Sequence, residues 1–578
     1  MIKKLAGCIG RYKKESMLAP LFVTMEVVLE VVIPLLMASL IDKGVEAGDM
    51  SQITKYGVVL AAACMVSLAC GALSGRYAAI ASAGFAKNVR ERMFHNVQDF
   101  SFSNIDRFST ASIVTRLTTD VSNVQMAFQM IIRIAVRGPM MLIFAMIMAF
   151  GLNKQLSLIF FAVIPFLGVG LYLVATRAHP VFERVFKTYD KLNLVVQENL
   201  HGIRVVKSFV REDHETKKFN KVSESIYKDF SKAEKILAFN SPLMQTSMYT
   251  CILLISWLGA KMIVAGSMTT GQLMSLITYS SQILMSLMML SMILVMTTIA
   301  RASAERVVEI LDEKSDIVSP EDAVKTVRDG SVTFDHVGFS YSGSMNNLCI
   351  KDADFSIRSG ETIGIVGGTG SAKSSLVQLI PRLYDVTSGS VSVGGVDVRK
   401  YDLHVLRDNV AMVLQKNQLF SGTIKENLRW GNENASDEEL RQACRLAGAD
   451  GFVSDFPDGY DTYIEQGGTN VSGGQKQRLC IARALLKKPK ILILDDSTSA
   501  VDTETDAVIR RGMKEYLPET TKIIIAQRIS SVQEADRIIV MENGEISGIG
   551  THEELLENND IYREIYDLQM KGGDKDGE

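Results

Sequence analysis

The sequence has few of the residues that stabilise small secreted domains or bind zinc. Its 578 residues include only seven cysteines, and no two of them form a CxxC pair. The cysteines are Cys8, Cys64, Cys70, Cys251, Cys349, Cys444 and Cys480. Because their number is odd and several lie in apolar runs, we expect neither a disulfide framework nor a zinc site. We interpret them as small buried apolar residues.

The sequence also lacks an excess of charge of either sign. It contains 62 basic and 65 acidic residues, which gives a formal net charge of −3. This balance provides no overall positive field, so we expect no nucleic-acid partner. Hydrophobic residues make up 47% and charged residues 22%, which excludes disordered, collagen-like and coiled-coil chains. The chain is too long for one core and predicts at least two domains.

The first 300 residues contain long apolar runs. Each run reaches the roughly 20 residues that a helix needs to cross a bilayer. A soluble helical bundle would interrupt these runs with a polar face at every turn. The six predicted spans are Met17–Ile41, Tyr56–Ala81, Ala127–Leu152, Leu156–Ala178, Ser241–Ala265 and Gln272–Ala300.

The links between these spans alternate in length. Three are short polar loops, whereas residues 82–126 and 179–240 form long, charged links that we expect to be helical. Basic residues gather in the long links and at the amino terminus, which indicates that these parts lie in the cytoplasm. The sequence thus predicts a multi-pass protein of the cytoplasmic membrane. No apolar stretch of the kind found in secretory signals follows Lys4 directly, so we expect Met1–Ser16 to form an amphipathic helix on the inner membrane surface.

The composition changes after Arg301. Short β-rich runs then alternate with helical stretches, which is typical of an α/β domain. We expect a transmembrane domain with two cytoplasmic coupling helices over residues 1–311 and a polar linker over 312–330. The α/β domain would cover 331–570, and a disordered tail 571–578.

A glycine-rich segment in the second domain has the context of a phosphate-binding loop. A strand over Glu361–Val366 precedes it and a helix beginning near Ser375 follows it. The segment consists of Gly367, Gly368, Thr369, Gly370, Ser371, Ala372, Lys373 and Ser374. Its backbone amides and the helix amino terminus favour phosphate, Lys373 can reach the terminal phosphates, and Ser374 can hold Mg²⁺. We therefore expect these residues, with Ser375, to bind ATP.

A second apolar strand, residues 491–494, ends in Asp495 and Asp496. A carboxylate at such a strand end lies beside the phosphate loop and can orient Mg²⁺ and its water. The predicted fold class is an α-helical six-span transmembrane domain fused to an α/β P-loop nucleotide-binding domain.

The segment Ser472, Gly473, Gly474 and Gln475, between the phosphate loop and this strand, resembles the signature of ATP-binding cassette proteins. The resemblance extends over essentially the whole chain. Six spans with long cytoplasmic links and one carboxyl-terminal cassette resemble a half-transporter of the exporter type, two of which make a working transporter.

The resemblance also implies roles for residues outside the phosphate loop. Tyr341 falls where the family stacks an aromatic ring on adenine, and Gln415 where a glutamine contacts Mg²⁺, together with Asp495 and Ser374. Ser499–Asp502 resembles the loop that contacts the other cassette of the dimer.

Three further segments resemble the parts that transmit motion between the domains. Glu465–Gly468 resembles the exporter loop that meets the coupling helices, and Phe102–Phe108 and Phe209–Glu215 resemble the two coupling helices themselves.

Three residues depart from the family pattern. The catalytic glutamate after Asp495 is replaced by Asp496, whose carboxylate is drawn back by about 1 Å, and such a displacement can lower the rate about 10²-fold. The switch histidine is replaced by Gln527, which cannot become cationic. Ala372 replaces the glycine before the lysine, and we expect it to be tolerated because alanine can adopt a helix-start conformation. The departures cluster on catalysis and spare binding, which favours slow hydrolysis over harmless variation.

The chain therefore resembles the degenerate half of a heterodimeric exporter. Its own site is expected to bind ATP with little turnover, while its signature completes the hydrolytic site of a second half-transporter. The expected function is ATP-driven export of lipophilic or amphipathic compounds, drugs or lipids among them. An ATP-gated channel or regulator, and a peptide exporter, are the alternatives.

Charged residues within the predicted spans raise a question about the transport pathway. Glu26 and Glu30 share one helix face, as do Arg133 and Arg137. The two glutamates either recognise cationic amphipaths or pair with the arginines. Flexible methionines of the last span either bind varied apolar ligands or simply pack. These are Met285, Met288, Met289, Met292 and Met296.

Overall fold

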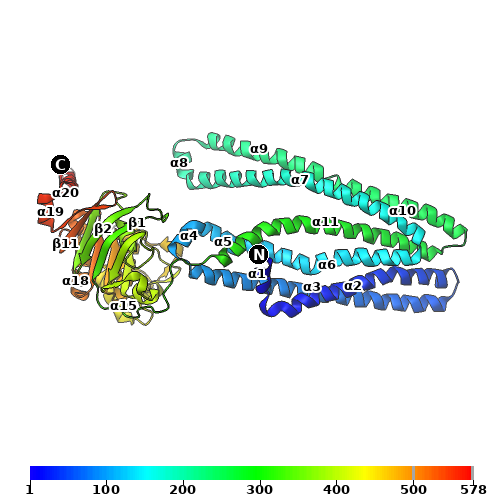
Figure 1. The fold of residues 1–578 in the computed structure, drawn as a ribbon, viewed down its shortest axis with the longest axis horizontal. Coiled ribbons are helices and arrows are strands. Elements are labelled where there is room, and N and C mark those ends of the chain that lie inside the picture. The colour runs from blue at the N-terminus through cyan, green and yellow to red at the C-terminus, as the bar shows by residue number, and fades with distance from the viewer. Residues whose placement is uncertain (498–500, 574–578) are drawn as a thin grey trace. The chain divides into compact units, whose positions relative to one another are not determined.

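The computed structural model describes residues 1–497 and 501–573, which form two compact units (Figure 1). The first unit comprises Met1–Gln98 and Ser109–Glu313, and the second comprises Asp99–Phe108 and Lys314–Glu578. The short segment Asp99–Phe108 therefore packs with the second unit although it lies within the sequence of the first.

The described residues of the first unit are helical apart from short turns. Its elements are α1 (Ile2–Gly7), η1 (Gly10–Tyr12), α2 (Lys13–Leu40), η2 (Ile41–Val45), α3 (Met50–Gln98), α5 (Thr110–Thr115), η3 (Arg116–Asp120), α6 (Val121–Leu152), α7 (Lys154–His201), α8 (Ile203–Ser208), α9 (Glu212–Leu237), α10 (Asn240–Val264) and α11 (Thr270–Asp312). Six helical stretches in the described residues are long and apolar enough to cross a membrane, which confirms the six predicted spans. The long links are mostly helical, but turns interrupt the first at residues 99–101 and 109 and the second at residues 202, 209–211 and 238–239, so neither is helical throughout as expected.

Two expected helices differ from those observed. The expected helix over Met1–Ser16 is divided, because Gly10 has a φ of +55° and the side-chain amide of Asn88 donates to the carbonyl of Cys8 over 2.8 Å. The second expected coupling helix, Phe209–Glu215, instead spans the turn between α8 and α9. Helix α8 ends at Ser208, and Val210 has a φ of +52°, a conformation that interrupts a right-handed helix.

The second unit combines two larger sheets with surrounding helices. Its strands are β1 (Val332–Phe339), β2 (Ile350–Ile357), β3 (Thr362–Gly367), β4 (Ser388–Val393), β5 (Val396–Asp397), β6 (Val410–Val413), β7 (Gly422–Thr423), β8 (Tyr463–Ile464), β9 (Ile491–Asp495), β10 (Thr521–Ile525), β11 (Arg537–Glu542) and β12 (Glu545–Gly550). Its helices are α4 (Phe102–Phe108), α12 (Lys373–Gln378), η4 (Val398–Lys400), α13 (Leu403–Asn409), α14 (Ile424–Arg429), α15 (Asp437–Leu446), α16 (Asp450–Ser454), η5 (Gly459–Asp461), η6 (Gln466–Gly468), α17 (Gly473–Leu486), α18 (Thr503–Tyr516), η7 (Ile529–Ser531), α19 (His552–Asn558) and α20 (Asp560–Gly573). The expected tail begins inside α20, so residues 571–573 are helical, and the remainder of that tail lies outside the described residues.

The central sheet has the strand order β12-β11-β3-β10-β9-β6. Every neighbouring pair from β11 to β6 is parallel, and only β12 is antiparallel. Strands β3, β9 and β10 are apolar and buried along most of their length, as expected of strands covered on both faces. A separate antiparallel sheet has the order β2-β1-β4-β5.

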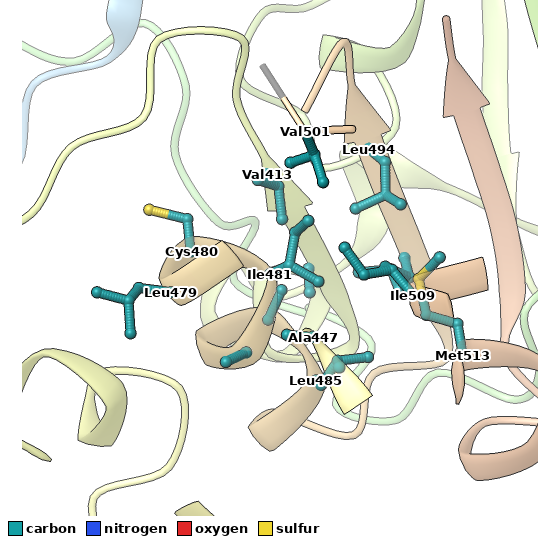
Figure 2. Close-up of a cluster of buried hydrophobic side chains, with 14 of the residues drawn as sticks. Val413, Ala447, Leu479, Cys480, Ile481, Leu485, Leu494, Val501, Ile509 and Met513 are labelled. Carbon is teal, nitrogen blue, oxygen red and sulfur yellow. The ribbon is translucent and has the colours of Figure 1, made fainter. Parts of the chain in front are cut away.

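A buried hydrophobic cluster fixes α17 against the central sheet. Ile481 and Leu485 of α17 gather with Leu494 of β9 and with Ile509 and Met513 of α18 (Figure 2). Ile481 and Ile509 have no solvent exposure. Because α17 begins with the predicted signature, this packing fixes the position of the signature relative to the end of β9.

Helices α2 and α11 are joined at the middle of the first unit by hydrogen bonds to α2 backbone. Pro34 has no amide hydrogen, so the carbonyl of Glu30 loses its usual helical partner. The side-chain amide of Gln282 donates to this carbonyl over 3.3 Å, and the hydroxyl of Tyr279 donates to the carbonyl of Val31 over 2.6 Å. These contacts satisfy backbone groups that lipid could not.

The charged residues of the spans form an ion-pair cluster. One guanidinium nitrogen of Arg137 donates to Glu26 Oε1 over 2.6 Å, and another donates to both carboxylate oxygens of Glu30 over 2.7 and 2.8 Å. All three side chains are largely buried. Of the two alternatives for Glu26 and Glu30, the structure therefore favours internal pairing, and the pairing residue is Arg137.

We predict that Arg137→Gln destabilises the protein because two carboxylates then lose their shared cation. The expected loss is about 3 kcal/mol, at the low end for broken buried ion pairs since the side chains keep some exposure. The triple change Glu26→Gln, Glu30→Gln and Arg137→Met should recover most of it. Thermal unfolding of the purified full-length chain tests this, and a triple variant as unstable as Arg137→Gln would contradict it.

Candidate functional site

Four loops at one edge of the central sheet hold most of the predicted site residues. Strands β3, β10, β9 and β6 lie side by side and run parallel, so their carboxyl ends meet at the same edge. The phosphate loop follows β3 and Gln527 follows β10. Asp495 ends β9, Asp496 comes directly after it, and Gln415 follows β6. Loops at the carboxyl ends of parallel strands are the usual ligand site of open α/β sheets.

The phosphate loop runs from the end of β3 into α12. Gly367 has a φ of +153°, and a side chain at this position would come within 2.2 Å of the carbonyl oxygen of Met541. The ammonium group of Lys373 donates to the carbonyls of Gly367 and Gly368 over 2.9 and 2.8 Å and to Ser371 Oγ over 3.2 Å. Burial lowers the pKa of Lys373. The loop thus holds the ammonium group of Lys373 at its centre. A bound phosphate would replace the carbonyl and hydroxyl oxygens that now accept from this group.

Ala372 does not adopt the helix-start conformation that we expected. Its φ of +70° and ψ of 19° are left-handed, which explains why glycine is the usual residue here. A non-glycine residue pays roughly 1–2 kcal/mol for this conformation. The loop keeps its form, but the alanine stores backbone strain beside Lys373.

Two adjacent carboxylates at the end of β9 have different partners. Ser374 Oγ donates to Asp495 Oδ1 over 2.9 Å. The side-chain amides of Gln527 and Gln415 donate to Asp496 Oδ2 over 2.6 and 3.4 Å. Burial raises the pKa of both carboxyl groups, and the hydrogen bonds oppose that rise. The structure thus brings together five residues that the sequence analysis assigned to the ATP site.

The donor set at this edge suits Mg²⁺ together with a nucleotide. The hydroxyl of Ser374, a carboxylate oxygen of Asp495 and the amide oxygen of Gln415 are hard oxygen ligands. Among the described residues no group of three or more His, Cys, Asp or Glu side chains could hold a metal ion. Mg²⁺ typically binds one or two carboxylates and completes its coordination with water and substrate phosphates, so these residues fit ATP–Mg²⁺.

Tyr341 lies close to the phosphate loop and to a second tyrosine. Its hydroxyl forms a hydrogen bond of 2.8 Å with Ser375 Oγ, and half of its surface remains exposed. The ring of Tyr384 packs edge-on against Tyr341, with centroids 5.2 Å apart. The hydroxyl of Tyr384 donates to Asp106 of α4 over 2.7 Å, and burial is the main cause that raises its pKa. The bounds of helix α4 match the first predicted coupling helix. The side chains of Asp106 and Tyr384 connect this helix to Tyr341.

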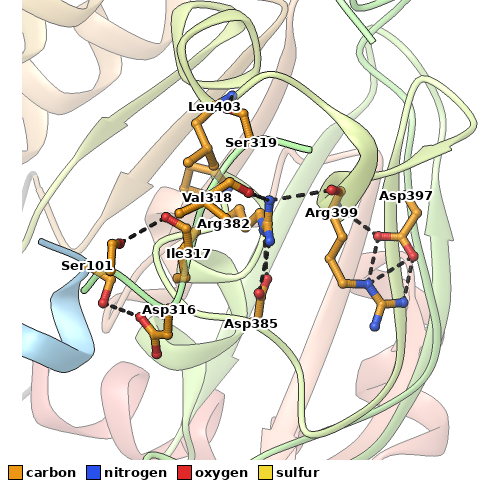
Figure 3. A network of polar contacts seen from close by, with 12 residues as sticks. Ser101, Asp316, Ile317, Val318, Ser319, Arg382, Asp385, Asp397, Arg399 and Leu403 are labelled. Carbon is orange, nitrogen blue, oxygen red and sulfur yellow. Dashed lines mark hydrogen bonds and ion pairs between the residues drawn. The ribbon is translucent and has the colours of Figure 1, made fainter. Parts of the chain in front are cut away.

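The residues before β1 also contact α4 (Figure 3). Both Ser101 and Ser103 donate to the carboxylate of Asp316, the latter over 2.8 Å. Arg382 donates to the carbonyl of Val318 over 3.1 Å and pairs with Asp385. The predicted linker is therefore bonded at both α4 and the body of the second unit.

The predicted signature forms the amino terminus of α17. Ser472 caps this helix, because its hydroxyl accepts from the amide of Gln475 over 3.2 Å while the Gln475 side chain accepts from the amide of Ser472 over 2.9 Å. Ser472 and Gly473 are exposed and Gly474 is partly exposed. The first amides of a helix have no partner within it, so this end can donate to an anion.

Residues beside the signature support its position. Lys476 donates to the carbonyl of Gly467 over 2.7 Å, which joins the helix to the predicted Glu465–Gly468 loop. Of the predicted Ser499–Asp502 loop, Ser499 and Ala500 lie outside the described residues. Asp502 caps α18, since its carboxylate accepts from the amide of Thr505 over 2.8 Å.

The sequence analysis missed one residue that holds the Gln527 loop. Gln569 of α20 donates to the carbonyl of Gln527 over 2.7 Å and accepts from the amide of Ile529 over 2.9 Å. This residue lies just before the predicted disordered tail, more than forty positions after Gln527. Only the amphipathic pattern of residues 560–569 in the sequence signals a packed helix there.

We predict that Ala372→Gly stabilises the protein by up to about 1 kcal/mol, because relief of the left-handed strain exceeds the entropic cost of glycine. Ala507→Gly, in the interior of α18, is the matched control and should destabilise by about 1 kcal/mol. Thermal unfolding of the full-length chain measures both. A loss of stability in Ala372→Gly comparable to the control would contradict the observed backbone conformation.

Comparison with protein families agrees with this architecture. The family described as the ABC transporter transmembrane region matches residues 17–287, and the family described as ABC transporter matches residues 350–499. The first match covers most of the helical unit and all or most of each of its six candidate spans, and the second begins at β2 and covers the phosphate loop and β9.

Individual relatives match over most of their length. The chain is 37% identical over 569 residues to the uncharacterized ABC transporter ATP-binding protein YfiB of Bacillus subtilis, covering 98% of this chain and 99% of that protein. It is 36% identical over 485 residues to YknU of the same organism, covering 84% and 83%. It is 31% identical over 484 residues to an ATP-dependent lipid A-core flippase of Desulfotalea psychrophila, covering 84% of each chain. The chain belongs to the ABC transporter family, as a multi-pass exporter half-transporter with a cytoplasmic ATP-binding domain.

Proposed function

We propose that this half-transporter exports lipophilic or amphipathic compounds together with a different second half, and that its own ATP site hydrolyses slowly. The contact that carries the proposal is the 2.6 Å hydrogen bond between Gln527 and Asp496. It joins two of the three residues that depart from the family pattern, at the point where the water would be activated.

The chemistry of this pair favours ATP retention over turnover. A general base has to reach the attacking water, and Asp496 is one methylene shorter than glutamate. One of its oxygens already accepts from two neutral amides, those of Gln527 and Gln415. A neutral amide stabilises the developing charge on the γ-phosphate less than a cationic histidine does. Lys373, Ser374 and the loop amides, which bind the nucleotide, are intact.

The signature supports an active role at a second site. Ser472 and the exposed start of α17 offer amide donors to an anion from outside this chain. No described hydrogen bond joins Ser472 or Gln475 to the phosphate loop of the same chain. In the family the signature faces ATP held by the other half, so this chain would complete its partner's hydrolytic site.

The turn after α8 offers a second surface for a partner. Apolar side chains at Val205, Phe209 and Val210 are 60%, 72% and 79% exposed. Isolated exposed apolar residues are common, but one on α8 and two at the turn directly after it suit burial against another protein. We propose that the partner's cassette covers this turn.

The names of some relatives and the membrane-spanning helices support the proposed substrate class. Some relatives are named lipid A-core flippases, so lipids belong among the proposed substrates. The complete signature, which can supply donors for hydrolysis at a partner's site, favours export over an ATP-gated channel. Stimulation of ATPase activity by lipophilic compounds in the reconstituted pair would distinguish export from gating.

We predict that Ser472→Ala removes most ATPase activity of the reconstituted pair, whereas Asp496→Asn leaves most of it. Loss of a donor to the developing charge costs about 10²–10³ in kcat, while Asp496 serves a site that is already slow. Steady-state ATPase assays of each variant pair measure this. If Asp496→Asn abolishes activity and Ser472→Ala is mild, the assignment of the two sites is reversed.

A matched variant separates catalysis from helix capping in this experiment. Ser436 caps α15 with the same reciprocal bonds that Ser472 forms at α17. Ser436→Ala should therefore cost about 1 kcal/mol of stability, as any lost cap does, without lowering turnover. Equal losses of activity in the two variants would show that Ser472 acts only as a cap.

We also predict that Gln569→Ala weakens ATP binding several-fold and leaves ADP binding unchanged. Each hydrogen bond between Gln569 and the Gln527 loop is worth about 1 kcal/mol. We propose that Gln527 contacts the γ-phosphate that ADP lacks, as the switch residue does in the family. Nucleotide titration of the purified chain measures both affinities, with the exposed Gln533→Ala as control. Equal weakening for ATP and ADP would indicate a purely structural role.

A further inference from the structure

A cavity lies between α6 and α11 in the membrane-spanning unit. Its volume is about 340 Å³, within the lower range of ligand-binding pockets. Three methionines (Met130, Met289 and Met292) and two isoleucines line it, together with Arg133 and Arg137. The charged residues that line the described cavity are thus both cationic.

The two arginines differ in their partners. Arg137 is engaged by Glu26 and Glu30, neither of which lines the cavity. Arg133 lies one helical turn away and forms no hydrogen bond or ion pair with any residue that the structure describes. A side chain at Gly75 of α3 would come within 3.6 Å of its guanidinium, so the arginine packs against α3 backbone without a carboxylate.

This arrangement orients the charges across the site. Both arginines line the cavity, whereas the carboxylates of Glu26 and Glu30, which pair with Arg137, do not. An unpaired arginine within a membrane-spanning helix is costly, and such residues mark substrate pathways. A guanidinium preferentially binds carboxylate or phosphate through paired donors.

We propose that this cavity binds the anionic headgroup, phosphate or carboxylate, of an amphipath. Arg133 binds the headgroup, and Met289 and Met292 contact its alkyl chain. Flexible methionine side chains adapt to such chains. The inference deepens the proposed export function by naming the charge of the substrate, and it replaces the cationic amphipaths that Glu26 and Glu30 alone had suggested.

Direct binding to the full-length chain in nanodiscs tests this site without ATP or a partner half. The probes are fluorescent phosphatidylglycerol and phosphatidylcholine with identical acyl chains, and fluorescent dodecanoate as a soluble anion. We expect the anionic lipid to bind at least about ten-fold more tightly than the choline lipid, the effect of one hydrogen bond to a charged group. Binding of dodecanoate, too, would show that the source of the headgroup is not restricted to membrane lipid.

Variants of the arginine identify the site. Arg133→Gln should abolish the preference for the anionic probe, Arg133→Lys should retain most of it, and Arg301→Gln, an exposed arginine on α11, should leave it unchanged. A preference that survives Arg133→Gln, or equal affinities for both lipids in the unaltered chain, overturns the proposal.

A further variant keeps the test decisive if Arg133→Gln does not fold. Met292 is 55% exposed, so Met292→Trp can be accommodated while its ring fills the cavity. This variant should weaken binding of the anionic probe, and unchanged binding would overturn the proposal. The binding test requires no ATP hydrolysis. If the cavity does not bind the anionic probe, the assignment of the slow ATP site is unaffected, and if that assignment is wrong, the cavity proposal is unaffected.

Discussion

The parallel pairing of β3, β10, β9 and β6 is the constraint on which the ATP-binding unit depends. Backbone hydrogen bonds fix these strands in register, with Ile365 opposite Ile525 and Ile525 opposite Asp495. Residues far apart in the sequence, such as Lys373, Asp495 and Gln527, therefore meet at one edge of the sheet. The strand order and register alone bring them there. The apolar cores on both faces of the sheet then fix α12 and α17 against it.

The same constraint explains which parts of this unit the sequence could predict. Residues that follow an apolar strand were recognised, because strand, turn and helix are local patterns. The conformation of Ala372 was not predicted. An alanine in place of the usual glycine does not by itself show whether the backbone there is left-handed. Gln569 was missed because it contacts the Gln527 loop through backbone atoms, and backbone contacts leave no residue-type pattern in the sequence.

The membrane-spanning unit shows a different limit. Its six spans were predictable because hydrophobic length alone specifies a spanning helix. The pairing of Glu26 and Glu30 was left open, since Arg133 and Arg137 share one helix face and differ by a single turn. Helix rotation and translation decide which of them meets the carboxylates, and the pairing observed with Arg137 leaves Arg133 exposed to the cavity. The segment Phe209–Glu215 is not one helix for a related reason: a positive φ at Val210 cannot be expected from the propensity of valine.

The placement of α4 has a mechanical consequence for the whole chain. Because Asp99–Phe108 packs with the second unit, the polypeptide crosses between the two units at three points, after Gln98, after Phe108 and after Glu313. Two of these crossings flank α4, so a tether at each end returns this helix to its site near Tyr384 whenever it dissociates. Its local concentration there stays high irrespective of how much protein the cell makes. Detachment of the helix would therefore be brief, because dilution cannot break a covalent link.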